Sequence, residues 1–162
     1  MIFDIDVSGE DILSGDYAVC ISDNNQIIKA FKMHPKTVNQ INKNFNLSKY
    51  TKYKPTLKKK KDLKIRIYSI IIYYIFKELN LNSNIELKIC RDFYNREQDI
   101  IYNLEYFLIT KLNLRINNIE FCKLESKSLA HKYSYLIRKN LIDSRKYLIK
   151  ISLEEIELFL SK

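Results

Sequence analysis

The first third of the chain contains three short segments with the composition of β-strands, following one another closely. These segments are residues 1–8, 16–22 and 26–33. They are rich in apolar and β-branched residues, which favour strands. A turn that holds both glycines of the chain, Gly9 and Gly15, separates the first two, and a short polar link separates the last two. Links of this kind join antiparallel neighbours, so this third predicts a three-stranded antiparallel meander.

Beyond residue 33 the apolar spacing alternates between the helical and the strand period. A short helix fits residues 34–48. Helices are expected at 64–80, 97–112 and 127–139, and strands at 85–92 and 114–124. A strand remains the alternative for part of 64–80, because β-branched residues are abundant there. A short strand at 146–151 and a helix that begins with the capping box of Ser152 and Glu155 are expected to complete the chain.

This order predicts an α/β fold with a central mixed five-stranded sheet: three antiparallel strands, then β-α-β units, with helices flanking the sheet. A strand–helix extension over about 141–162 follows it. The length of 162 residues fits one domain, so we expect residues 1–162 to fold together, with a basic insertion at about 49–66.

The net charge of +9 is concentrated in that insertion, which contains nine Lys or Arg residues and one acid, Asp62. Such a balance favours a polyanionic partner. No basic amphipathic helix with a wide apolar face is evident there, which favours nucleic acid over a membrane surface. Lysines would meet phosphates while tyrosines stack on bases. The predicted contacts are Lys52, Lys54, Lys58, Lys59, Lys60, Lys61, Lys64, Arg66, Tyr50 and Tyr53. A solvated, mobile loop is the alternative.

The sequence also favours a cytoplasmic protein that is not embedded in a membrane. Acids precede any apolar run at the N-terminus, unlike a signal peptide. The longest apolar run, residues 67–76, is too short to span a bilayer. The three cysteines, Cys20, Cys90 and Cys122, match no zinc or CxxC spacing and are expected to be reduced thiols.

Two carboxylates interrupt the first strand. Asp4 and Asp6 alternate with Phe3, Ile5 and Val7, so both project from the same face. Neighbouring carboxylates repel each other, and a bound cation relieves that repulsion. The pattern therefore predicts a divalent metal site, with the solvent-facing side of a half-exposed sheet as the alternative.

The order of elements, together with the stretches IDVSG (5–9) and GDYAVCI (15–21), resembles the ribonuclease H-like superfamily and most closely its Holliday-junction resolvase branch. The topology covers roughly residues 1–140, and the motif covers only the first 21. The resemblance implies that Asp6 is the first-strand metal ligand and that Asp92, after the fourth strand, is the second. Asp4 faces the same way and His131 takes the place of the last acid of the family, completing the site.

The chain departs from the family at the start of the last helix, where a D-x-x-D spacing is replaced by Ser128-Leu129-Ala130-His131. Histidine also binds divalent metals, but Ser128 does not replace an acid. Glu125 is a nearby substitute, and Glu78 is a candidate for the helix-borne Glu of ribonuclease H. For Asp92 and His131 the alternatives are a helix N-terminal acid and an ordinary helical surface residue.

The resemblance implies a Mg²⁺- or Mn²⁺-dependent nuclease acting on structured or double-stranded nucleic acid, and it leaves a homodimer open. Three alternatives remain. The first is a nucleic-acid-binding protein with a degenerate site, which Ser128 favours. The second is an actin-like or sugar-kinase-like domain, although the glycine-rich phosphate loops are absent. The third is an interaction module whose lysines only keep it soluble.

Overall fold

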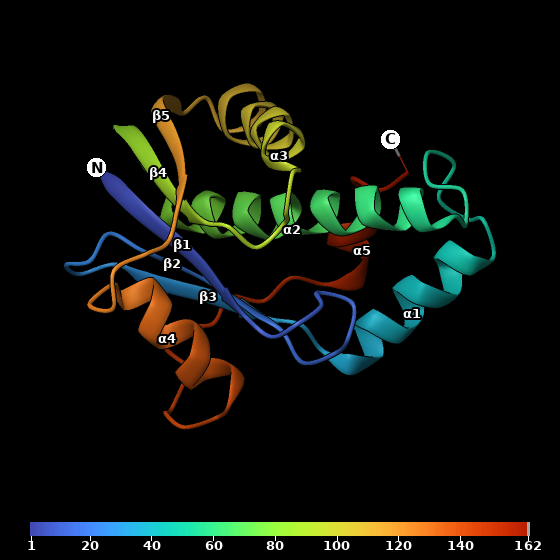
Figure 1. Cartoon of the computed structure of the whole chain (residues 1–162), viewed down its shortest axis with the longest axis horizontal. Helices are drawn as coiled ribbons and strands as arrows, with labels where there is room; N and C mark the ends of the chain where they lie inside the picture. Colours follow the sequence, from blue (N-terminus) through green and yellow to red (C-terminus); the bar gives the residue numbers. More distant parts are fainter. Residues whose placement is uncertain (162) are drawn as a thin grey trace.

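A five-stranded mixed sheet forms the middle of the molecule in the computed structural model, which describes residues 1–161 (Figure 1). The strands are β1 (Ile2–Ser8), β2 (Ala18–Ser22), β3 (Ile28–Lys32), β4 (Asn84–Cys90) and β5 (Arg115–Cys122). They lie in the order β3-β2-β1-β4-β5. β1, β2 and β3 pair antiparallel, whereas β4 is parallel to β1 and β5 is parallel to β4. The predicted meander and mixed sheet are confirmed.

Helices cover both faces of this sheet (Figure 1). They are α1 (Pro35–Asn46), α2 (Leu57–Leu79), α3 (Glu97–Leu104), the π-helical η1 (Glu105–Lys111), α4 (Leu129–Arg138) and α5 (Leu153–Glu157). On one face, α2 contacts the sheet and packs against α3, η1 and α5. On the other face, α4 contacts β1, β2 and β3. Within residues 1–161, no helix combines the length and the apolar character needed to cross a bilayer.

The longest helix, α2, begins seven residues before the predicted start, so the run of four lysines forms its first turns. The side chain of Thr56 caps the helix by accepting a hydrogen bond from the backbone N–H of Lys59, and lysine is a good helix former. The helix ends at Leu79 and is capped by Asn80, which adopts the left-handed conformation. The alternative of a strand within 64–80 was therefore wrong, as was a mobile loop for the second half of the basic segment.

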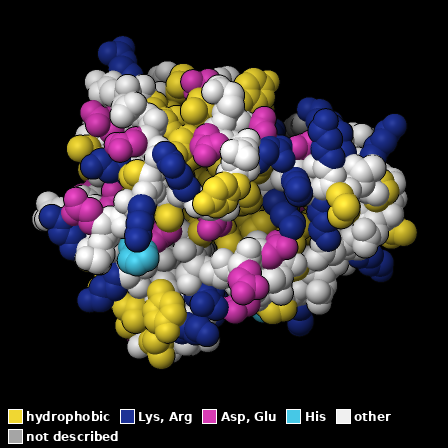
Figure 2. All heavy atoms as spheres, in the orientation of Figure 1, with side chains coloured by type: hydrophobic (Ala, Val, Ile, Leu, Met, Phe, Trp, Pro, Cys, Tyr) yellow, Lys and Arg dark blue, Asp and Glu magenta, His cyan; other side chains and the backbone are white. Residues whose placement is uncertain are grey.

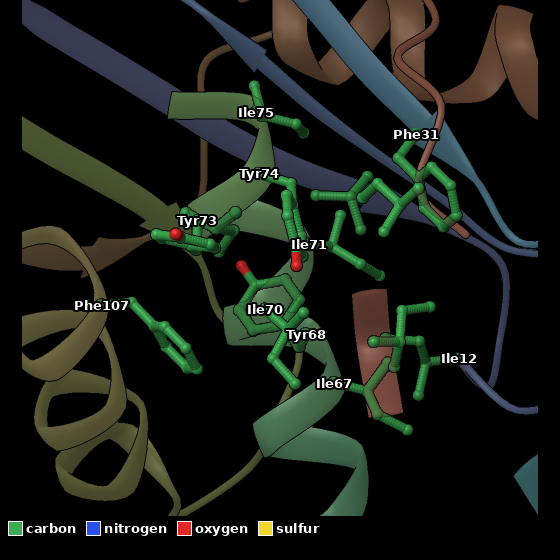
Figure 3. Packing of buried hydrophobic residues seen from close by; sticks show 14 of the residues in the cluster. Ile12, Phe31, Ile67, Tyr68, Ile70, Ile71, Tyr73, Tyr74, Ile75 and Phe107 are labelled. Atoms are coloured by element: carbon green, nitrogen blue, oxygen red, sulfur yellow. The ribbon is translucent and has the colours of Figure 1, made fainter. Parts of the chain in front are cut away.

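The main core lies between α2 and the sheet face formed by the odd-numbered residues of β1. Phe3 and Ile5 are buried there together with Tyr68 and Ile71 of α2. Figure 3 shows Tyr73 of α2 beside Phe107 of η1, and their ring centroids are 5.3 Å apart. Asp4 and Asp6 point to the opposite face, which α4 covers.

Truncation of Phe107 tests this packing. Its ring is fully buried and contacts the rings of Tyr73 and Phe159 and the guanidinium of Arg66. We expect Phe107→Ala to lower the free energy of unfolding by about 3–5 kcal/mol, because it removes apolar burial and leaves a cavity. Urea unfolding measures the change. The matched exposed variant Tyr102→Ala should change stability by less than about 0.5 kcal/mol, and a similar result for both variants would contradict this packing.

The C-terminal extension covers the outer edge of β3. The predicted strand at 146–151 is reduced to one parallel bridge between Ala30 and Leu148, so the prediction of a strand was wrong. The residues before the bridge turn sharply, since the N–H of Tyr147 bonds to the carbonyl of Ser144, and this turn limits the pairing. The capping box of Ser152 and Glu155 is confirmed at the start of α5.

Candidate active site at the carboxyl ends of β1 and β4

The parallel strands β1 and β4 end side by side and bring Asp6 close to the end of β4. Ile5 lies opposite Ile89, so the next residues, Asp6 and Cys90, are neighbours on the face toward α4. Burial and the adjacent Asp6 carboxylate raise the pKa of the Cys90 thiol to about 12. Cys90 therefore stays protonated at neutral pH and is able to donate to Asp6, a role that the sequence did not indicate.

Asp6 is held on two sides although its side chain is almost fully buried. Its Oδ1 accepts a hydrogen bond from the N–H of Val7 at 2.8 Å, and its Oδ2 lies 2.7 Å from Nδ1 of His131. Ser128 caps α4 by accepting from the N–H of His131. More than half of the His131 side chain is exposed. The structure thus joins two of the predicted site residues through a direct contact.

Asp92 follows β4 and is fixed by a tyrosine that was not among the predicted site residues. The hydroxyl of Tyr17 donates to Oδ2 of Asp92 at 2.7 Å. Asp92 is exposed at the surface, yet partial desolvation of its carboxyl group raises its pKa above the ordinary value; the charge of Asp6 adds to this rise, while the Tyr17 bond opposes it. The charge of Asp6 therefore reaches the carboxyl group of Asp92. Tyr17 lies within the GDYAVCI stretch, so this stretch was the sequence feature from which its role at the site could have been predicted.

Asp4 lies on the same face as Asp6 but one pleat farther from the strand end, and it is tied to a different group. Its Oδ2 accepts from the side-chain amide of Asn24 at 2.7 Å, and the carbonyl oxygen of that amide accepts from the N–H of Leu129 at 2.8 Å. Asn24 thus links Asp4 to the first turn of α4. The role of Asn24 arises only when the β2–β3 hairpin has folded against α4, so no local sequence motif indicates it.

The two substitute acids lie elsewhere. Glu78, near the end of α2, pairs with Lys29 at the start of β3, 3.5 Å away, and this is the end of the sheet opposite to Asp92. Glu125 is exposed in the loop before α4 and pairs with Lys127 at 3.2 Å. Neither contacts Asp6.

The basic segment divides into lysines at the surface and cations that the fold itself uses. Lys58, Lys59, Lys60 and Lys61 lie on the first turns of α2, and Lys52 and Lys54 lie in the exposed loop before it. Figure 2 shows Lys and Arg side chains gathered over this end of the molecule. In contrast, Lys64 forms an ion pair with Asp11 at 2.8 Å, and Arg66 bonds to the carbonyl of Phe159 and to Asn103. Both of these stabilise the fold.

The two tyrosines of this segment face inward. Tyr50 is only 1% exposed, so the prediction that its ring stacks on a base was wrong. The chain returns toward the core there, and the ring joins the main apolar cluster. Tyr53 is half-buried against the same cluster.

Comparison of the chain with known protein families, with characterised proteins and with solved structures gave no match. Among residues 1–161, no group of three or more His, Cys, Asp or Glu side chains is arranged to hold a metal ion. The site therefore rests on two separate contacts, Asp6 with His131 and Asp92 with Tyr17.

The raised pKa of Asp92 gives a prediction for stability. A carboxyl whose pKa is higher in the folded than in the unfolded chain destabilises the fold once it ionises. This cost is absent below the ordinary value of 3.8 and complete above the folded pKa. We therefore expect Asp92→Asn, which still accepts the bond from Tyr17, to raise the free energy of unfolding at pH 7 and to have no such effect below pH 3.8.

A second aspartate provides the control with the opposite sign. Although burial opposes it, the ion pair with Lys64 lowers the pKa of Asp11, so Asp11→Asn should reduce stability at pH 7. Urea unfolding of both variants at several pH values measures the two effects. A loss of stability in Asp92→Asn at pH 7 would contradict the electrostatic description of the site.

Proposed function

We propose that the chain is a divalent-metal-dependent nuclease of ribonuclease H-like type that acts on structured or double-stranded nucleic acid. The observation that carries this proposal is the placement of Asp6 and Asp92 near the adjacent ends of the parallel strands β1 and β4, where the charge of Asp6 raises the pKa of Asp92. The mixed five-stranded sheet, with three antiparallel strands followed by the parallel strands β4 and β5, is the architecture expected from the sequence. The lysine-rich start of α2 provides a surface for a phosphate backbone.

Mg²⁺ or Mn²⁺ is the proposed cofactor, held by Asp6 and Asp92. Carboxylate oxygens are the ligands that these ions prefer, and Mg²⁺ keeps several waters when a protein supplies only one or two carboxylates. The repulsion between the two carboxylates is the strain that a cation would relieve. When bound, the ion supplies charge stabilisation at the phosphate. Asp4, tied to Asn24, stays a predicted ligand of lower rank.

The protein groups around the carboxylates have roles of their own in this proposal. Tyr17 holds Asp92 in one orientation through the bond to Oδ2. His131 is positioned by Asp6 and is exposed to solvent, so its imidazole is able to exchange a proton near the phosphate. Lys58 and its neighbours would hold the substrate backbone without reading its sequence.

A nicking assay tests the proposal. Purified protein is incubated with branched DNA, linear duplex DNA and an RNA–DNA hybrid, each labelled at one end, with Mg²⁺, Mn²⁺ or EDTA. Cleavage that requires the cation and occurs at a defined position in the labelled strand supports the proposal. No cleavage of any of these substrates with either ion would contradict it.

A non-catalytic nucleic-acid-binding protein is the second candidate, because several groups at the site already have partners. Both oxygens of Asp6 accept hydrogen bonds or contact His131, and Ser128 serves as the cap of α4 where the family has an acid. Salt-sensitive binding of the same substrates without cleavage would favour this candidate.

A further inference from the structure

A pocket of about 430 Å³ lies directly beside Asp92, between the loop after β1, the first half of α2 and the loop after β4. Figure 2 shows a hollow with an apolar floor near the middle of the visible face, next to the Lys and Arg side chains over the start of α2. The volume is within the range of sites that enclose small organic molecules. Asp92 belongs both to this pocket and to the candidate active site, so an occupant would adjoin the phosphate at that site.

The floor and the mouth of the pocket are apolar and aromatic. Ile12 and Ile65 are buried at the floor, and Phe93 is half-buried against Tyr68, with ring centroids 5.2 Å apart. Tyr94 at the mouth is 87% exposed, so its ring has a free face. Flat apolar surfaces of this kind accept a nucleobase, because every base offers a π-face for stacking.

The pocket wall carries the acids Glu10, Asp11 and Asp92 as well as three cations, of which one has no ion-pair partner in the described chain. Lys64 is paired with Asp11, and Arg96 is paired with Asp62 and Asp99. Lys61 is exposed and forms no ion pair within the described chain. An incoming nucleotide would thus find an apolar surface for its base and a single free ammonium group for its phosphate.

From this geometry we infer that the pocket binds one unpaired nucleotide next to the phosphodiester that a cation on Asp6 and Asp92 would hold, an inference that rests on the proposed nuclease function. A base that is stacked and paired in a continuous duplex cannot enter a pocket, whereas an unpaired base enters at little cost. The substrate class is therefore nucleic acid with an unpaired nucleotide at the cleaved position, such as a bulge, in preference to uninterrupted duplex.

The test compares two DNA duplexes that differ only in whether one 2-aminopurine is bulged or paired, and the same pair made as RNA. Binding is measured in EDTA by fluorescence anisotropy, and 2-aminopurine emission reports the surroundings of the base. We expect the bulged duplex to bind about tenfold more tightly than the paired one, and its 2-aminopurine emission to be quenched on binding. Tyr94→Ala should remove most of this preference. Lys61→Glu, as a separate variant, should weaken binding of the bulged duplex.

Tyr102→Ala is the matched control, since Tyr102 is an exposed tyrosine of α3 outside the pocket. It should leave the preference unchanged. Equal binding of both duplexes, or a preference that survives in Tyr94→Ala, would overturn the inference. Because binding is measured without metal, this failure is distinct from failure of the proposed function. Cleavage without a preference for the bulged duplex would contradict only the inference about the pocket. A preference without cleavage would support the pocket in a non-catalytic protein.

Discussion

Asp6→Asn is expected to reduce metal-dependent cleavage by about a thousandfold while leaving the fold intact. Asp6 is the carboxylate that approaches both His131 and the Asp92 region, and charge stabilisation by a bound cation is worth several kcal/mol, which corresponds to a loss of this size. Asparagine has nearly the same shape and retains an oxygen for the N–H of Val7. The single-turnover rate with saturating Mg²⁺ measures the effect.

Glu78→Gln provides the matched carboxylate-to-amide control, because Glu78 pairs with Lys29 at the opposite end of the sheet. Its cleavage rate should equal that of the unmodified protein. Thermal unfolding of Asp6→Asn guards against simple unfolding, and we expect a midpoint close to that of the unmodified protein, since asparagine keeps the shape and the acceptor for the N–H of Val7. A rate for Asp6→Asn within threefold of the unmodified protein (about 0.6 kcal/mol) would contradict the assignment of Asp6 to the site.

Replacing Lys58, Lys59, Lys60 and Lys61 together by alanine is expected to weaken nucleic-acid binding by about a hundredfold or more. Each neutralised phosphate contributes a slope of about −0.9 to the dependence of log affinity on log salt concentration, so the slope should become less negative by about 2–4. Alanine is the strongest helix former, and these side chains lie on the outer turns of α2, so the helix should persist. Filter binding over a series of salt concentrations measures both quantities.

The control for this variant removes the same charge elsewhere. Four exposed lysines distant in sequence serve for it: Lys43, Lys111, Lys139 and Lys150. If net charge alone attracts the nucleic acid, both quadruple variants will lose affinity equally. A selective loss in the α2 variant supports a localised binding surface, and an equal loss would contradict it.

The sheet could be predicted because the sequence patterns that specify it lie within short stretches of the chain. Short polar links force antiparallel neighbours, and period-two alternation alone is enough to place Asp4 and Asp6 on one face. The resemblance implied that Asp6 and Asp92 belong together, and the parallel pairing of β1 with β4 brings the carboxyl ends of both strands to the same edge of the sheet. These features depend on the backbone and on residue order, and not on how side chains pack.

The partners of the site residues could not be predicted, because they come from distant segments. Tyr17 meets Asp92 across 75 positions of the chain, and Asn24 reaches Leu129 across 105. Tyr50 lies in a basic segment whose composition suggests exposure, yet tertiary packing buries it. In the same way, the fold uses Lys64 and Arg66 for internal contacts that charge alone does not reveal.

The most direct test of the account is a crystal structure of the protein soaked in Mn²⁺ and measured at an X-ray wavelength where manganese scatters anomalously. The account predicts an anomalous peak at coordination distance from carboxylate oxygens of both Asp6 and Asp92, and its loss in Asp6→Asn crystals. No peak at saturating Mn²⁺, or a peak that touches neither carboxylate, would contradict the metal site and the nuclease that depends on it.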